Sequence, residues 1–166
     1  MPRIPTLVYL AVLTSCTNVV VQTDIPYDDR FGVDVLDVYS PPPAGVPRPA
    51  VLVIHGGGWA DGIYRSSMAA HAERLSEAGY VAVNIEYRLT PNGGQFPHGV
   101  QDCFCALSYL RANAARYRLD PDRVAGMGYS AGGHLASLLG VAADDDVHEP
   151  DCVWGRTGPP RAVVAS

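Results

Sequence analysis

Apolar and polar positions change along the chain in the way that strands and helices require. Residues 19–27 and 31–41 predict two antiparallel strands, and a proline-rich stretch follows from Pro41 to Pro49. From residue 50 onward, short apolar runs typical of buried strands are followed by segments whose apolar residues recur at helical spacing. The predicted strands cover residues 50–54, 80–87, 123–127 and 161–165, and the predicted helices cover 66–78, 99–117 and 131–139.

This alternation predicts an α/β fold with a mostly parallel sheet, helices on both faces, and an active site at the carboxyl ends of the strands. The chain has 166 residues, of which 48% are hydrophobic and 17% charged, so it can bury a core. Its net charge is −5 and no basic cluster is visible, which argues against nucleic acid or an anionic membrane surface as the main partner. Small neutral substrates fit this composition better.

One serine lies between a predicted strand and a predicted helix. Ser130 is the centre of Gly128-Tyr129-Ser130-Ala131-Gly132, a G-x-S-x-G sequence that holds a nucleophilic serine on a strained turn. Any larger residue at Gly128 or Gly132 is expected to clash, and the start of the following helix favours negative charge beside the serine. A tight turn with a serine cap is the simpler alternative for this motif alone.

A glycine-rich segment follows the strand at residues 50–54. It reads His55-Gly56-Gly57-Gly58-Trp59, and consecutive glycines allow backbone N–H groups to approach a ligand closely. This is the geometry of an oxyanion hole, in which one donor lowers the barrier to ester hydrolysis by about 3 kcal/mol. A flexible glycine turn would not explain why the segment follows a strand and precedes Ser130.

The chain resembles the α/β-hydrolase esterases of the hormone-sensitive-lipase and feruloyl-esterase-like groups. The resemblance rests on the two motifs above together with EYRL at 86–89, Phe96-Pro97 and DPDRV at 120–124. The resemblance covers about residues 24–166. It implies that Ser130 is the nucleophile, that the N–H groups of Gly57, Gly58 and Ala131 form the oxyanion hole, and that His55 supports the glycine loop. In this family the catalytic acid and histidine follow the serine by many tens of residues. We therefore expect both beyond residue 166, with the fold cut short after the strand that follows the Ser130 helix.

The chain's own histidines do not fit the order serine, acid, histidine. His71 and His98 precede Ser130, His134 is expected to point into packing, and His148 comes before the next strand. Arg88 and Asp102 predict a structural ion pair, with Glu86 as a residue at the end of a strand.

The first sixteen residues suggest export. Arg3 precedes a short apolar run, and Leu13-Thr14-Ser15-Cys16 resembles the lipobox of bacterial lipoproteins, in which the cysteine becomes the lipidated first residue. The run is too short to span a bilayer, and a buried first strand is the alternative. The prediction is a signal at 1–16 and a partial α/β-hydrolase domain at 17–166. The protein would be periplasmic or anchored to a bacterial membrane through Cys16. It would be cytoplasmic if residues 1–16 are not an export signal.

No cofactor and no metal are expected. Asp144 to Asp146 form a solvated acidic loop without a second oxygen-rich cluster at ligand spacing. Cys103 faces the apolar stripe of its helix, whereas Cys105 and Cys152 would be able to pair in an exported protein, although the spacing does not fix this pairing.

Taken together, the sequence predicts a serine carboxylic-ester hydrolase that acts on a small-molecule ester. Two alternatives stay open: a serine peptidase of the prolyl-oligopeptidase type, and a non-catalytic lipoprotein that keeps the hydrolase fold. The acyl group, the alcohol, the oligomeric state and whether the chain is a fragment or a degenerate product cannot be derived from the sequence.

Overall fold

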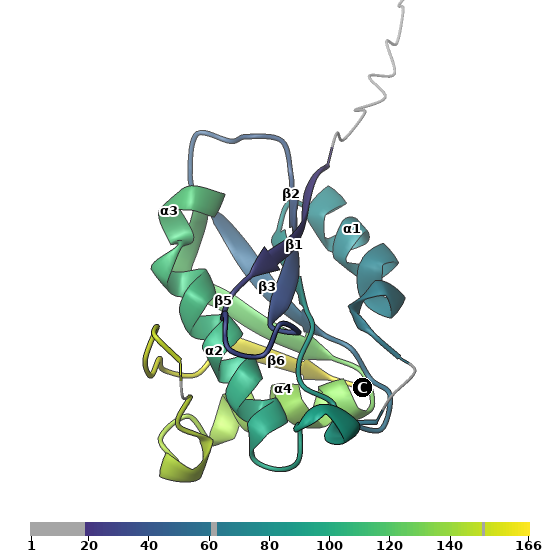
Figure 1. The fold of residues 1–166 in the computed structure, drawn as a ribbon. Coiled ribbons are helices and arrows are strands. Elements are labelled where there is room, and N and C mark those ends of the chain that lie inside the picture. The colour runs from purple at the N-terminus through teal and green to yellow at the C-terminus, as the bar shows by residue number, and fades with distance from the viewer. Residues whose placement is uncertain (1–18, 61–62, 151) are drawn as a thin grey trace, which may run out of the picture.

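A six-stranded mixed sheet forms the centre of the computed structural model, which describes residues 19–60, 63–150 and 152–166 (Figure 1). Across the sheet the strands lie in the order β1 (Val20–Pro26), β2 (Val35–Ser40), β4 (Val81–Ile85), β3 (Arg48–Ile54), β5 (Leu119–Gly128) and β6 (Ala162–Ala165). β1, β2 and β4 pair antiparallel, whereas β4, β3, β5 and β6 are parallel. The predicted antiparallel start and parallel continuation are thus both confirmed.

Helices cover both faces of the sheet, as the alternation of apolar runs predicts (Figure 1). They are α1 (Ala69–Glu77), α2 (His98–Ala112), α3 (Ala114–Tyr117) and α4 (Ala131–Val141), with 3₁₀ turns η1 (Arg65–Met68), η2 (Thr90–Asn92) and η3 (Asp146–His148). None of the helices in the described ranges is long and apolar enough to cross a membrane.

Two separate apolar cores result from this layering. On one face, Met68 and Ala72 of the η1–α1 segment pack against Val51 and Val53 of β3. On the other face, the apolar stripes of α2 and α4 pack against the opposite side of the same strands, with Leu107, Leu139, Leu52, Ile54 and Val83 among the buried residues. Successive residues of a strand point to opposite faces, so the continuous apolar run of β3 supplies both cores.

The prediction of one continuous helix over 99–117 is wrong, because the structure has two helices there, α2 and α3. The helix is interrupted at Asn113, whose side-chain Nδ2 donates to Tyr109 O at 2.9 Å. An asparagine that bonds to the backbone in this way competes with the helical ladder. Arg118 then adopts a left-handed conformation with φ of 53°, and the chain turns into β5.

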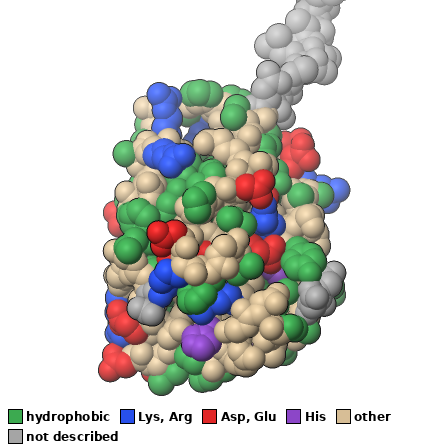
Figure 2. All heavy atoms as spheres, in the orientation of Figure 1, with side chains coloured by type: hydrophobic (Ala, Val, Ile, Leu, Met, Phe, Trp, Pro, Cys, Tyr) green, Lys and Arg blue, Asp and Glu red, His purple; other side chains and the backbone are tan. Residues whose placement is uncertain are grey.

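Charged side chains of both signs are scattered among apolar ones on the face shown in Figure 2, without a large basic area. The predicted signal at residues 1–16, including Cys16, lies outside the described residues.

Candidate active site

The glycine loop and the Ser130 turn follow two neighbouring parallel strands. β3 pairs with β5 so that Ile54 lies opposite Gly128, and each strand ends within one residue of its motif. Carboxyl ends of parallel strands meet at the same edge of a sheet. The β3–β5 register therefore brings the segment 55–59 beside Tyr129 and Ser130.

Ser130 adopts a backbone conformation that few residues other than glycine adopt. Its φ is 53° and its ψ is −118°, and α4 begins at the next residue. Such a conformation costs on the order of 1–3 kcal/mol and persists only where the surroundings enforce it. Strained backbone of this kind concentrates at functional sites, and the serine side chain lies exposed at the turn.

The two flanking glycines leave no room for a side chain, as the sequence predicts. A Cβ atom at Gly128 would lie 2.1 Å from Gly132 O, and one at Gly132 would lie 2.2 Å from Ile54 O. Both obstacles are backbone atoms, which cannot move aside without distorting the sheet or the helix. The turn therefore requires glycine at both positions.

The glycine loop is bent by three consecutive residues with positive φ. Gly57, Gly58 and Trp59 have φ values of 113°, 62° and 60°. The carbonyl of Trp59 accepts hydrogen bonds from Thr90 N at 2.7 Å and from Thr90 Oγ1 at 2.8 Å, which fixes the far end of the loop. In the described ranges no hydrogen bond uses the backbone N–H of Gly57, Gly58 or Ala131, so these donors are available.

His55 is fully buried and engaged on both sides of its ring. Nε2 lies 2.7 Å from Glu86 Oε1, and Nδ1 lies 2.7 Å from Gly56 O. The ring stacks on Tyr87 at 4.3 Å, and the Tyr87 hydroxyl donates to His55 O at 3.1 Å. Both ring nitrogens face oxygen atoms of Gly56 and Glu86, so neither is directed at the Ser130 hydroxyl. This geometry agrees with a supporting role for His55 in the glycine loop.

The sequence missed Glu86, which it left as a residue at the end of a strand. Its carboxylate bonds His55 through Oε1 and accepts from Arg65 N at 3.1 Å through Oε2, so it joins the glycine loop to η1. The available signal was its position. Glu86 follows β4, and β4 is the parallel neighbour of β3, which His55 follows. Side chains just after the carboxyl ends of neighbouring parallel strands lie close together.

The predicted ion pair between Arg88 and Asp102 is confirmed. Arg88 Nη2 lies 2.6 Å from Asp102 Oδ1, and Arg88 N and Nε each donate to Oδ2 at 2.9 Å. Both residues are buried, and the ring of Phe31 lies 3.9 Å from the guanidinium carbon. The pair connects the segment after β4 to helix α2 and so holds one wall of the candidate site.

The remaining histidines lie apart from the Ser130 hydroxyl. Within the described ranges no imidazole nitrogen is within hydrogen-bonding distance of Ser130 Oγ. His98 Nδ1 lies 3.0 Å from Gly93 O, His71 is exposed, and His148 is buried against Phe96. The expectation that His134 points into packing is wrong. Its side chain is exposed, with its ring edge-on to Trp59 at 5.4 Å, because residue 134 lies on the outer side of α4.

Two hollows of about 420 Å³ each flank the candidate site. One lies between the η1–α1 segment, the glycine loop and the ends of β5 and β6, and its lining includes Gly57, Met68, Met127, Tyr129 and Val164. The other, which we call the aromatic hollow, lies between the glycine loop, the start of α2 and the outer side of α4. Its lining includes Gly58, Trp59, Phe96, Val100, His134 and Leu138.

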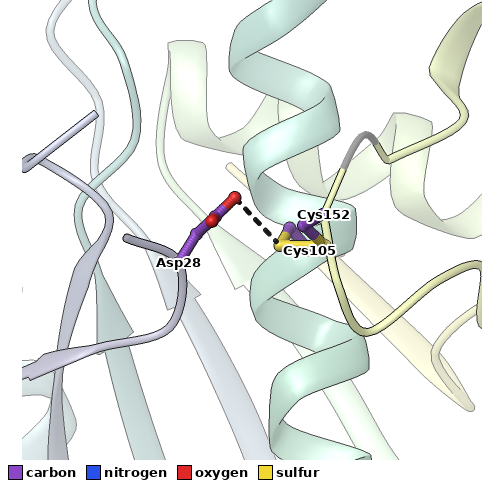
Figure 3. Close-up of side chains that lie close together, drawn as sticks. All are labelled: Asp28, Cys105 and Cys152. Carbon is purple, nitrogen blue, oxygen red and sulfur yellow. Dashed lines mark hydrogen bonds between the residues drawn. A yellow bond between two sulfur atoms is a disulfide. The ribbon is translucent and has the colours of Figure 1, made fainter. Parts of the chain in front are cut away.

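A third feature joins distant parts of the chain. Cys105 of α2 and Cys152 form a disulfide, and Asp28 Oδ2 lies 3.9 Å from Cys105 Sγ (Figure 3). These three are the one set of potential metal ligands in the described residues. Two thiols joined to each other offer no thiolate to a metal ion, and the Asp28 carboxylate is occupied by Arg30 Nε at 2.7 Å. Cys103 is free and buried, as its place in the apolar stripe predicts.

Comparison with known proteins gives consistent results. The BD-FAE family model matches residues 36–158. Neutral cholesterol ester hydrolase 1 of Rattus norvegicus is 40% identical over 126 residues, which cover 71% of this chain and 29% of that protein. Carboxylesterase NlhH of Mycobacterium tuberculosis is 34% identical over 122 residues, which cover 73% of this chain and 37% of that protein.

Solved structures agree with the sequence relatives. A bacterial heroin esterase has a TM-score of 0.64 and 34% identity over 82% of this chain and 43% of its own length. The chain spans between 29% and 37% of the two curated relatives named above.

Proposed function

Because the chain belongs to the BD-FAE family of α/β-hydrolase esterases, we propose that the protein hydrolyses carboxylic esters with Ser130 as its nucleophile. The observation that carries this proposal is the turn at Ser130, which has a positive φ and starts α4 beside the glycine loop. A strained turn that exposes a serine at the carboxyl end of a central strand is what nucleophilic attack requires.

The proposed reaction has two halves. Ser130 Oγ attacks the ester carbonyl carbon while its proton passes to a general base, and the carbonyl oxygen becomes an oxyanion. The carbon–oxygen bond to the alcohol then breaks, and the alcohol leaves with that proton. Water attacks the acyl-serine in the same way and releases the acid. The N–H groups of Gly57, Gly58 and Ala131 are proposed to bind the oxyanion in both halves, supported by the lack of other acceptors for them among the described residues.

We propose that the general base and its carboxylate partner lie outside the 166 residues of this chain. The hydrogen bonds and ring contacts of the chain's own histidines support this proposal, and so does the greater length of the relatives. The test compares ester hydrolysis by residues 17–166 with hydrolysis by the full-length gene product. Turnover typical of an esterase in the shorter chain would mean that the base lies within it.

Export with a lipid on Cys16 remains a further proposal. It is supported by Leu13-Thr14-Ser15-Cys16 and by the disulfide between Cys105 and Cys152, because disulfides persist mainly in oxidising compartments. Mass spectrometry of protein from a bacterial host should find a diacylated or triacylated Cys16 at the N-terminus. An intact Met1, or cleavage elsewhere without added acyl mass, would overturn it.

The nucleophile is tested by Ser130→Ala in the full-length protein, assayed with a p-nitrophenyl ester. Loss of the nucleophile in a serine hydrolase lowers turnover by up to about 10⁶. Ser137→Ala is the matched control. Ser137 lies on the same helix, where its hydroxyl donates to Gly133 O at 2.8 Å, and its removal should leave hydrolysis within about twofold. Unchanged hydrolysis in the Ser130→Ala protein would exclude the assignment.

A further inference from the structure

The aromatic hollow adjoins one of the proposed oxyanion donors and the helix that starts at Ser130. Gly58 is part of its lining, and His134 and Leu138 line it from α4. His134 N donates to Ser130 O at 3.0 Å, so the wall is continuous with the first turn after the serine. At 1.5 Å per residue, Leu138 lies about 12 Å along the helix axis from Ser130. The hollow is therefore long enough for a chain of several carbons.

The walls of the aromatic hollow are held in place by contacts outside it. Trp59 is fixed through its carbonyl by two hydrogen bonds from Thr90, and its ring meets the ring of His134 at an interplanar angle of 90°. The start of α2, which supplies Val100, is held to the segment after β4 by the Arg88–Asp102 pair. A rigid, mostly apolar hollow of this volume can bind an apolar group without first having to form.

Resting on the proposed esterase function, we propose that the aromatic hollow is the acyl subsite and takes an apolar acyl group of several carbons. The acyl group becomes bonded to Ser130 in the first half of the reaction and is released from it by water in the second, so its pocket has to keep a fixed position relative to that residue. The aromatic hollow meets this requirement, because one wall is the helix that starts at Ser130 and another adjoins Gly58. The alcohol instead leaves after the first half, on the side of the general base.

This assignment predicts how the rate depends on acyl length. Burying one methylene group in an apolar site is worth about fourfold in kcat/KM. For p-nitrophenyl hexanoate over p-nitrophenyl acetate, four additional methylenes give a preference of up to about 250-fold. An alcohol series with a constant acetyl group should show no comparable dependence on the aromatic hollow.

The experiment measures kcat/KM of the full-length protein for both esters in three variants. Leu138→Trp fills the hollow and should lower the hexanoate-to-acetate ratio at least tenfold. Leu138→Ala enlarges the hollow and should move the optimum to longer acyl chains. Val141→Trp is the control, because Val141 lies on the same helix with 84% of its side chain exposed and outside the hollow's lining.

The outcomes separate the subsite from the function on which it rests. Acetate hydrolysis that depends on Ser130, together with an acyl preference that neither Leu138 variant changes, overturns the subsite and leaves the esterase proposal standing. If the Leu138 variants instead change the preference among esters of different alcohols, the hollow binds the leaving group, and the proposal is also overturned. Absence of any Ser130-dependent hydrolysis overturns the esterase proposal and the acyl subsite together.

Discussion

A buried carboxylate at the start of β2 should make the protein less stable as the pH rises. Asp34 is 1% exposed, and its Oδ2 has no hydrogen-bond partner among the described residues. Its Oδ1 lies 3.4 Å from the Tyr27 hydroxyl, whose single proton also faces Glu86 O at 2.8 Å. Burial and the nearby Asp102 and Asp28 raise the pKa of Asp34 to about 6, although Arg88 opposes this shift.

The size and sign of the effect follow from linkage between protonation and folding. The pKa of Asp34 is about 6 in the folded protein, against 3.8 for the ordinary side chain, so the folded state binds the proton more tightly. The stability that protonated Asp34 contributes is fully present below about pH 3.8 and is lost as the pH rises through 6. A shift from 3.8 to about 6, at 1.36 kcal/mol per pH unit, corresponds to about 3 kcal/mol at neutral pH and above.

Asp34→Asn removes this penalty, because a neutral amide of nearly the same shape replaces the carboxylate. We expect the variant to unfold at about the same denaturant concentration as the parent protein at pH 4. At pH 8 it should be more stable, by up to about 3 kcal/mol. The assay is guanidinium unfolding followed by circular dichroism at both pH values.

Asp29→Asn serves as the control, because Asp29 is an exposed residue in the same loop and should change neither value. Equal pH dependence in the Asp34→Asn variant and the parent protein would refute the reasoning. A variant that is less stable than its parent at pH 8 would show that the charged carboxylate is stabilised in the fold.

Two further predictions concern stability. Gly132→Ala should lower the free energy of unfolding by more than about 3 kcal/mol, because its Cβ would lie 2.2 Å from Ile54 O. The control in the same unfolding assay is Gly45→Ala, whose Cβ would meet nothing within 4 Å. Equal unfolding midpoints for the two variants would contradict the clash. Replacing Cys105 and Cys152 together by serine removes a cross-link that spans 47 residues and should lower the free energy of unfolding by about 4 kcal/mol. Both proteins are measured without reductant. If reductant does not destabilise the parent protein, the disulfide is contradicted.

The order of elements and the two motifs could be predicted because each depends on local pattern. Apolar runs and helical spacing placed the strands and helices, and glycine at 128 and 132 is required by contacts within or next to the turn. That the two motifs lie at the same edge of the sheet then follows from the rule that carboxyl ends of parallel strands share an edge.

Other features depend on contacts between segments far apart in the sequence. Glu86 bonds to His55 across 31 residues, and the Tyr27 hydroxyl donates to Glu86 O across 59 residues. The exposure of His134 depends on which side of α4 faces the sheet, and the short apolar helix gives no clear polar side. Pairing of Cys105 with Cys152 likewise requires the loop after α4 to return to α2, which spacing alone does not encode.

Covalent trapping tests the central claim most directly. The full-length protein is treated with a fluorophosphonate, which phosphonylates an activated serine, and the modified peptide is identified by mass spectrometry. The account predicts one adduct per chain on Ser130, and no adduct in the Ser130→Ala protein. An adduct on another serine, or equal labelling of the Ser130→Ala protein, would contradict Ser130 as the nucleophile.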